Sequence, residues 1–395
     1  MTLITLAKII LFLAGLIILV KIIVFPFHRA RRHDLIFLGS SRTRYGINPA
    51  AVDRIAGTTS RNVEKSSITP ADAYLMLKKI IRNYRPKILV IEISDLGFFC
   101  KPDIPAPSAP LPPFMRDVHT IVKKRRSVLR AWSRLFVSAF GRPRCEVRKK
   151  TGFKTLKRKL DRDAQIGFRG GKWTKKYINK KQLDYLYRIL NLCRAKKIKA
   201  VLLSMPVHPS CLLYRKDIQD AHNFFERVAA SYGIPYWDLR LLSDNAIRQS
   251  DQLFADWAHL SPKGAQVFSK YLGHRLLAHK NGQNAPADHC VDFKNRIQEI
   301  KGIAGILLKA LPAEPRRAYR VSGTVLRADP DLPAEYRFEA HDERSARIWV
   351  RGYSPDPSAD FLAPGPGTVK ISVYVREPGS QNDYDAMQRI SIKVS

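Results

Sequence analysis

Near-continuous apolar segments that alternate with amphipathic helical segments restrict the fold of this chain more than any other feature. The predicted strands span 34–39, 87–93, 200–205 and 234–237. The predicted helices span 70–83, 181–195, 218–231 and 262–278. Strands that are apolar throughout are buried on both faces, as in a parallel sheet covered by helices. We therefore predict an α/β class protein, with a doubly wound, flavodoxin-like domain at 28–282 and a parallel sheet of about five strands.

The first 27 residues predict a membrane anchor. The run from Ile9 to Val20 is apolar without interruption, and snorkelling of Lys8 and Lys21 extends it to roughly the 20 residues that a bilayer requires. A cleavable signal peptide and a buried core helix are the alternatives. No small-x-small cleavage site precedes the basic cluster at 28–32, so we favour an uncleaved single-pass anchor. That cluster, by the positive-inside rule, places the body of the protein in the cytoplasm.

Residues 101–180 interrupt the α/β pattern as a basic insertion. Six prolines at 102–113 predict an extended linker, and 116–181 holds 23 Lys and Arg against 4 Asp and Glu. Within it, 116–140 has the pattern of a basic amphipathic helix with Trp132 and Phe136 on its apolar face. Such a helix suits a membrane interface, although packing against the sheet explains the pattern equally well.

The last third of the chain predicts a change of architecture. A helical linker is expected at 283–315, containing a helix at 291–311 and ending near Pro312 and Pro315. From 316 to 395, short segments in which every second residue is apolar are separated by turns rich in Pro, Gly and Asp. This predicts a C-terminal antiparallel β-sandwich.

The net charge of +35 predicts an anionic partner, namely anionic lipid or an acidic polymer. Nucleic acid is disfavoured because the basic residues cluster beside the apolar segment and no nucleic-acid fold signature is present. No GxxxxGK[ST], GxGxxG or HExxH pattern occurs, so we expect no cofactor. The five cysteines form no CxxC pair and no metal-ligand spacing, so neither a metal site nor a disulfide framework is expected.

Two segments carry the residue types of nucleophilic catalysis. Ser41 follows the first predicted strand in Gly-Ser-Ser-Arg, and Asp256 and His259 precede the last predicted helix. A serine needs a base to remove its proton, and an imidazole base needs a partner that fixes its tautomer. The order Ser, Asp, His is one known order for such a triad, and the carboxyl ends of parallel strands are where α/β sheets bind ligands. Each segment alone is also explained by helix capping or by chance.

LGSSRTRYGINP and FADWAHLSPKGAQVFSKYL resemble the first and last blocks of membrane-anchored SGNH (GDSL-like) hydrolases and acyltransferases. The resemblance covers roughly 34–100 and 183–275, and it is nearest to the subgroup with GSS in place of GDS. That subgroup includes proteins of teichoic acid D-alanylation, and exopolysaccharide O-acetylation proteins are more distant relatives. The resemblance implies Ser41 as nucleophile, His259 as base and Asp256 as its orienting residue. It also implies a substrate outside the cytoplasm, and we weight this above the positive-inside rule.

The oxyanion motifs of that family are altered here. The glycine of its second block is absent from Asn62-Val63-Glu64-Lys65-Ser66-Ser67, and its third block is replaced by Ser94-Asp95. The remaining oxyanion candidates are Asn62 and the backbone N–H groups of Ser41 and Ser67. Arg42 is a candidate for holding a substrate carboxylate or phosphate, although a salt bridge within the fold is the commoner role. His208 either lines the same cleft or lies on a surface loop.

These observations predict a membrane-tethered esterase or O-acyltransferase that moves an acyl group, most simply acetyl, on a carbohydrate or cell-envelope polymer. A membrane-bound acyltransferase is the expected acyl donor for the transferase variant. The alternative is a catalytically inactive SGNH-fold scaffold or assembly protein of an envelope polysaccharide system, which the altered oxyanion motifs favour.

Overall fold

A computed structural model describes residues 33–93, 95–98, 151–156, 178–215, 217–283 and 290–395. The predicted anchor, the basic helix at 116–140 and most of the insertion lie outside these residues. No helix within the described ranges combines the length and the hydropathy that crossing a bilayer requires.

The predicted parallel sheet is confirmed. Five strands pair in the order β2-β1-β3-β4-β5, and every neighbouring pair is parallel. This is a doubly wound order, and in such sheets ligands generally bind outside the carboxyl ends of the strands where the order reverses, which here is beside β1. The strands are β1 (Leu35–Gly39), β2 (Ser60–Glu64), β3 (Ile88–Glu92), β4 (Lys199–Ser204) and β5 (Tyr236–Asp238).

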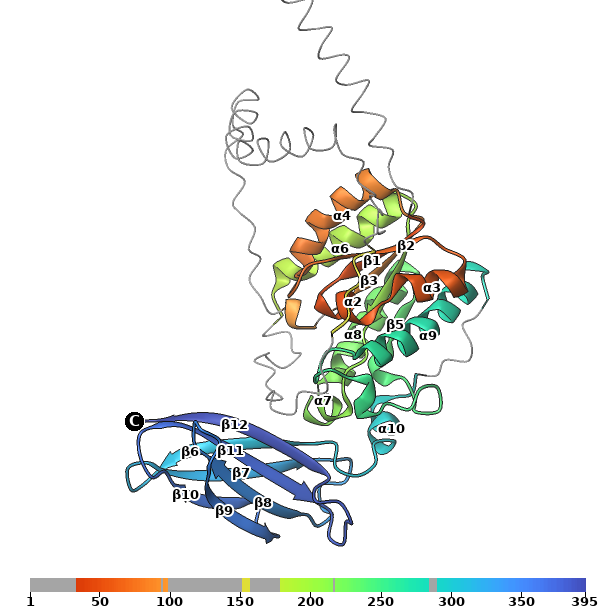
Figure 1. The fold of residues 1–395 in the computed structure, drawn as a ribbon. Helices are drawn as coiled ribbons and strands as arrows, with labels where there is room; N and C mark the ends of the chain where they lie inside the picture. The colour runs from red at the N-terminus through yellow and green to blue at the C-terminus, as the bar shows by residue number, and fades with distance from the viewer. Residues whose placement is uncertain (1–32, 94, 99–150, 157–177, 216, 284–289) are drawn as a thin grey trace, which may run out of the picture. The chain divides into compact units, whose positions relative to one another are not determined.

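Helices cover both faces of this sheet, as Figure 1 shows. On one face α4, α6 and α8 bury residues such as Leu77, Leu186 and Phe225, and on the other α3 and α9 bury Val52 and Phe268. The α-helices are α2 (Ser41–Gly46), α3 (Pro49–Ala56), α4 (Pro70–Tyr84), α6 (Lys180–Ala195), α7 (Pro209–Tyr214), α8 (Ile218–Tyr232), α9 (Pro262–Lys280) and α10 (Phe293–Gln298). Short 3-10 helices are η2 (Asp95–Phe98), η3 (Leu239–Leu241) and η4 (Asp251–Leu253).

Local sequence explains where the longer helices begin. Thr69 caps α4 by accepting a hydrogen bond from the N–H of Asp72, and the Asp72 carboxylate accepts from the N–H of Thr69. Ser261 caps α9 through the N–H of Gly264. In both helices the next residue is proline, which is favoured at the first helical position because its missing N–H would have no partner there.

The described ends of the insertion lie against the α/β domain. The N–H of Asn62 in β2 donates to the carbonyl of Thr151 (2.9 Å), and the N–H of Lys154 donates to the carbonyl of Arg44 in α2 (3.1 Å). Farther along the chain, the N–H of Asn179 donates to the carbonyl of Phe98 (2.8 Å). Residues 151–156 therefore flank the outer strand of the sheet beside α2.

The C-terminal region contains two antiparallel sheets, ordered β10-β7-β6 and β12-β11-β8-β9, with one shared hydrophobic core. The predicted helix at 291–311 is wrong beyond its first turns: α10 ends at Gln298, and β6 runs through Pro312. The β-strand region therefore begins at Gly305 rather than at 316. Its strands are β6 (Gly305–Ala313), β7 (Ala318–Leu326), β8 (Glu335–His341), β9 (Arg347–Ser354), β10 (Ser358–Leu362), β11 (Gly367–Arg376) and β12 (Ala386–Val394).

Candidate active site

Ser41 is the first residue of α2 and lies at the carboxyl edge of the sheet, one residue beyond the turn that ends β1. The Ser40 hydroxyl caps α2 by accepting from the N–H of Arg42 (3.1 Å), and the N–H of Ser40 donates to Glu92 Oε2 (2.6 Å). Gly39 leaves no room for a side chain, because a Cβ there would lie 2.1 Å from Thr43 Oγ1. This close packing fixes the turn that presents Ser41.

The Ser41 hydroxyl contacts the ring of His259. Ser41 Oγ and His259 Nε2 are 2.8 Å apart although the residues are separated by 218 positions in the chain. Tyr45 packs edge-to-face against the ring, with centroids 5.8 Å apart. The distance lies within the range in which a base takes a proton from a serine.

Asp256 holds the other side of the His259 ring. His259 Nδ1 lies 2.9 Å from Asp256 Oδ1 and 3.0 Å from Oδ2, and Oδ1 also accepts the N–H groups of Ala258 (2.9 Å) and His259 (2.8 Å). Burial raises the pKa of the Asp256 carboxyl, but the His259 ring and these N–H groups outweigh burial and hold the pKa well below its usual range. An ionised Asp256 accepts the Nδ1 proton, so the Nε2 lone pair faces Ser41.

A compact loop between η4 and α9 carries both Asp256 and His259. Phe254 and Leu260 form an antiparallel bridge, and the N–H of Ala255 donates to the carbonyl of His259 (2.9 Å). The loop is thereby closed on itself like a short hairpin, and its ends are fixed by η4 and by the capped start of α9. Asp256 and His259 consequently approach Ser41 as one unit.

Neither sequence-based interpretation of His208 is correct. The residue is 1% exposed and caps α7. Its Nδ1 lies 2.7 Å from Ser210 Oγ, its Nε2 lies 3.0 Å from Asp251 Oδ1, and its N–H donates to the carbonyl of Trp257 (3.1 Å). The ring also packs against Trp257, with centroids 5.0 Å apart. His208 therefore supports the loop that carries Asp256, and no local pattern in the sequence points to that role.

The side chain of Asn62 is not available as an oxyanion donor. It is buried, and its Nδ2 donates both of its hydrogens, to the carbonyls of Thr43 (3.1 Å) and Ile47 (2.8 Å). The amide instead ties β2 to α2 and to the residue after it. The expectation that Asn62 faces a substrate oxygen is corrected accordingly.

Ser67 and Arg42 remain predicted substrate contacts. Ser67 lies on an exposed turn with φ 53°, a conformation that favours glycine. Among the described residues, nothing accepts the hydrogen of its backbone N–H. Arg42 is half-buried beside Ser41, and no carboxylate in the described part of the chain forms an ion pair with it.

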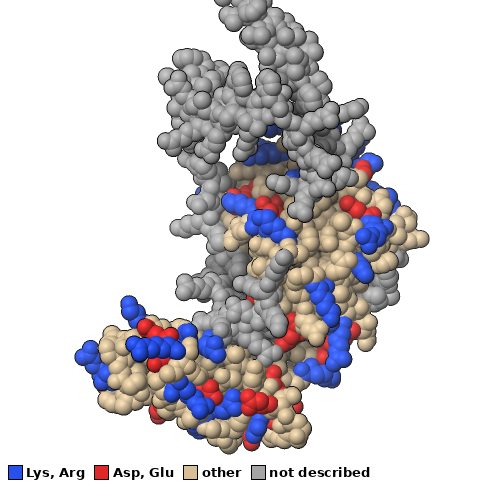
Figure 2. Space-filling model, viewed as in Figure 1, with Lys and Arg blue, Asp and Glu red and all other residues tan. Residues whose placement is uncertain are grey.

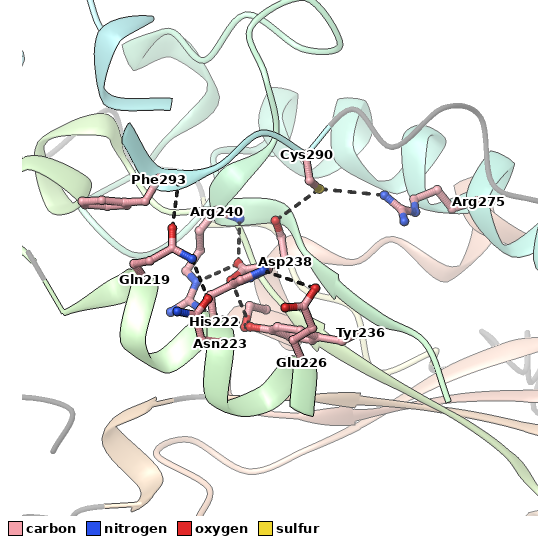
Figure 3. Close-up of polar contacts among 11 residues, drawn as sticks. Gln219, His222, Asn223, Glu226, Tyr236, Asp238, Arg240, Arg275, Cys290 and Phe293 are labelled. Carbon is pink, nitrogen blue, oxygen red and sulfur yellow. Dashed lines mark hydrogen bonds and ion pairs between the residues drawn. The ribbon is translucent and has the colours of Figure 1, made fainter. Parts of the chain in front are cut away.

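A second polar cluster, missed from the sequence, lies at the carboxyl ends of β4 and β5 (Figure 3). Arg240 contacts both Asp238 oxygens (2.7 and 2.6 Å), which also lie near His222 Nδ1 (3.1 Å) and the Tyr236 hydroxyl (2.9 Å). Burial raises the pKa of Asp238, but Arg240 and His222 hold it well below its usual range. Because these groups satisfy one another inside the protein, the cluster is structural. Over the described ranges, no three His, Cys, Asp or Glu residues are grouped closely enough to hold a metal ion.

The chain is similar to several solved structures. One is a GDSL-like lipase from Bacteroides thetaiotaomicron, at 11% sequence identity and a TM-score of 0.31, with 61% of this chain and 86% of that chain covered. Another is a lipase/acylhydrolase from Enterococcus faecalis, at 14% identity and a TM-score of 0.34, with 64% of this chain and 98% of that chain covered. A third is the esterase EstA from a Pseudoalteromonas species, at 12% identity and a TM-score of 0.31, with 63% of this chain and 100% of that chain covered. No protein-family model and no curated protein matches the chain.

Proposed function

We propose that this protein is an SGNH-type serine esterase or O-acyltransferase. The observation that carries the proposal is the continuous contact from Ser41 Oγ to His259 Nε2 and from His259 Nδ1 to Asp256. Three residues from two distant segments meet in the geometry that nucleophilic acyl transfer needs, and chance proximity of all three in this order is improbable.

The geometry supports a two-step reaction. Ser41 Oγ attacks the acyl carbonyl carbon while His259 Nε2 takes the serine proton, and the tetrahedral intermediate then expels the alcohol, which receives that proton. In the second step His259 takes a proton from water or a sugar hydroxyl, the new oxygen attacks the acyl-serine, and Ser41 Oγ leaves with the proton. The N–H of Ser41 is the first oxyanion donor, since the first N–H groups of a helix have no partner within the helix.

An acetyl group on a carbohydrate or envelope polymer is the substrate class that we propose. The resemblance of 34–100 and 183–275 to GSS-type SGNH proteins supports it, as does the apolar segment at 3–27, which would tether the site to a membrane outside the cytoplasm. A membrane-bound acyltransferase would then supply the acyl group, and the C-terminal β-strand region is available to hold the polymer. A reporter fused after Ser395 tests the topology, and a cytoplasmic location of that end would remove envelope polymers from consideration.

Covalent labelling tests the catalytic proposal directly. The purified full chain is treated with a fluorophosphonate probe and assayed on 4-nitrophenyl acetate. We expect labelling and hydrolysis in the wild type, loss of both in Ser41→Ala, and no change in Ser231→Ala, an exposed serine at the end of α8. Labelling that persists in Ser41→Ala, with the label found on another serine, would refute the assignment.

A non-catalytic scaffold is the second candidate, and the occupied amide of Asn62 favours it. Removing one oxyanion donor typically lowers the rate about 10²–10³-fold. If Asn62 does not serve and no other group replaces it, hydrolysis would be correspondingly slow. Wild-type protein that neither reacts with the probe nor hydrolyses the ester, while melting cooperatively, would establish the scaffold.

A further inference from the structure

The amino edge of the parallel sheet carries a cluster of cations. Exposed Lys and Arg side chains lie in and beside the two loops that precede β3 and β4, at 82–87 and 194–199, and these loops contain no Asp or Glu. The cations are Arg82, Arg85, Lys87, Arg194, Lys196, Lys197 and Lys199. The loops are adjacent, because the N–H of Lys199 donates to the carbonyl of Lys87 (2.9 Å). We call these two loops the amino-edge patch.

Helix capping explains only part of this charge. Cations in the last turn of a helix complement its dipole, and Arg82 and Arg194 serve α4 and α6 in that way. Lys87, Lys197 and Lys199 lie beyond those helices and the residues that cap their ends. Asp34 forms an ion pair with Lys87 (3.1 Å), so most of the positive charge remains uncompensated by the described residues around it. Lys and Arg side chains also occur elsewhere on the face drawn in Figure 2; the distinguishing feature of the loops at 82–87 and 194–199 is that they contain no Asp or Glu.

A cavity adjoins the patch at the same edge. Its volume is about 350 Å³, roughly that of ten water molecules. Arg194 and Lys199 contribute its charge, Tyr232, Ile198 and Ile234 line its walls, and no acidic residue lines it. The Arg194 guanidinium lies over the Tyr232 ring, 4.8 Å from the centroid, which holds it at the cavity. The cavity also meets His279, whose Nε2 is buried without a hydrogen-bond partner in the described structure, and burial and Lys199 lower the pKa of this ring.

We propose that the amino-edge patch binds anionic phospholipid, with the adjoining cavity accepting one phosphate headgroup. Charge complementarity supplies the first argument, because clustered Lys and Arg beside a membrane attract anionic lipid. Position supplies the second. The apolar run from Ile9 to Val20 ends 14 residues before Leu35, the first residue of β1. β1 begins at the same edge of the sheet as the patch, so the chain enters the fold on the side where the cations lie.

This docking leaves the candidate active site on the opposite edge. A strand rises about 3.3 Å per residue, so the four steps from Leu35 to Gly39 in β1 separate the two edges by about 13 Å, and Ser41 lies beyond the far end of the strand. Ser41 thus faces away from the lipid surface, and changes in the patch leave the contacts of the triad intact. The lipid proposal and the proposed catalytic function can consequently fail independently.

The test uses the full chain reconstituted in nanodiscs of phosphatidylcholine, with or without phosphatidylglycerol. Acetylation rates of individual lysines are measured by mass spectrometry. With phosphatidylglycerol we expect Lys87, Lys196, Lys197 and Lys199 to react about fivefold more slowly, the factor that corresponds to the attraction of one basic residue to an anionic surface. High salt should abolish the difference. Lys309 and Lys393, exposed lysines of the C-terminal sheets, should react equally in both discs.

A matched pair of variants separates charge at the patch from charge in general. Lys196→Glu/Lys197→Glu should remove the slower reaction of Lys199, whereas Lys309→Glu/Lys393→Glu should preserve it. Equal rates in both discs would overturn the proposal. Equal protection by inorganic phosphate in discs without phosphatidylglycerol would assign the patch to a soluble anion. Equal protection there by a DNA oligonucleotide at equal charge would assign it to nucleic acid; either result also overturns the proposal.

Discussion

Replacing Asp256 by Asn changes the hydrogen bonding of the His259 ring while conserving shape. The amide oxygen can still accept the N–H groups of Ala258 and His259, which lie 2.9 and 2.8 Å from Oδ1. The amide nitrogen, however, then faces His259 Nδ1 and donates to it. The ring proton moves to Nε2, where it points at Ser41 Oγ, so the nitrogen that must take the serine proton is already protonated.

We therefore expect Asp256→Asn to lower kcat by about 10⁴-fold, the loss that the same change causes in a chymotrypsin-type triad. Because the substituted group does not contact the substrate, KM should change little. Steady-state hydrolysis of 4-nitrophenyl acetate by the full chain measures both constants. A folded variant that keeps its kcat within about tenfold of the wild type would refute the orienting role of Asp256.

Asp251→Asn is the matched control. Asp251 also faces a histidine, with Oδ1 3.0 Å from His208 Nε2, but the N–H of Ser210 donates to His208 Nδ1 (3.3 Å). His208 therefore carries its proton on Nε2, and the amide oxygen of an asparagine can accept that proton as the carboxylate does. We expect kcat within about threefold of the wild type, since the ring keeps its tautomer.

Two further predictions concern stability. The pKa of Asp256 is depressed in the folded protein, so its stabilising contribution is present above the ordinary value of 3.8 and is lost as the pH falls through and below that value. The difference in Tm between wild type and Asp256→Asn should thus be constant from about pH 5 to 7 and shrink below about pH 4, and a difference that grows on acidification would contradict the assignment. Arg240→Met leaves the buried Asp238 carboxylate without its ion pair and should cost about 3–5 kcal/mol in denaturant unfolding. Asp238→Asn/Arg240→Met should cost less, and equal costs for the two would show that the ion pair is unimportant.

The central sheet was predictable because its inner strands are apolar on both faces. β1, β3 and β4 read as continuous hydrophobic segments, whereas β2 has the sequence Ser-Arg-Asn-Val-Glu and was not predicted. β2 is an outer strand, pairs with β1 on one side, and buries mainly Ser60 and Asn62. Polar residues are compatible with such a position, so hydrophobicity carries no signal for it.

The helix expected at 291–311 fails for a different reason. Ile306 and Leu307 lie three and four positions after Ile303, which is the pattern of a helical face, yet Ile306 and Leu307 belong to β6. A short apolar run is compatible with both the helical period of 3.6 residues and the strand period of two, and here pairing with β7 selects the strand. Pairing partners far along the chain are invisible in a local pattern.

The residues of the candidate site also differ in whether a local sequence pattern identifies them. Ser41, Asp256 and His259 were identified because each lies in a short motif at the end of a predicted element. His208 was misjudged because its partners, Asp251 and Trp257, reach it only through the folded loop. Asn62 was misjudged because its neighbours are backbone carbonyls of α2 and of the residue after it, groups that every sequence contains.

The hydrogen bond between Asn179 and Phe98 gives the α/β domain an insertion point whose two ends already meet. The eighty residues from 99 to 178 leave and re-enter the fold at this pair. Because Phe98 and Asn179 contact each other directly, the fold holds these two ends together by its own hydrogen bond, whereas 151–156, which contact β2 and α2, are part of the domain. The insertion can accordingly change in size and charge while the triad geometry is conserved.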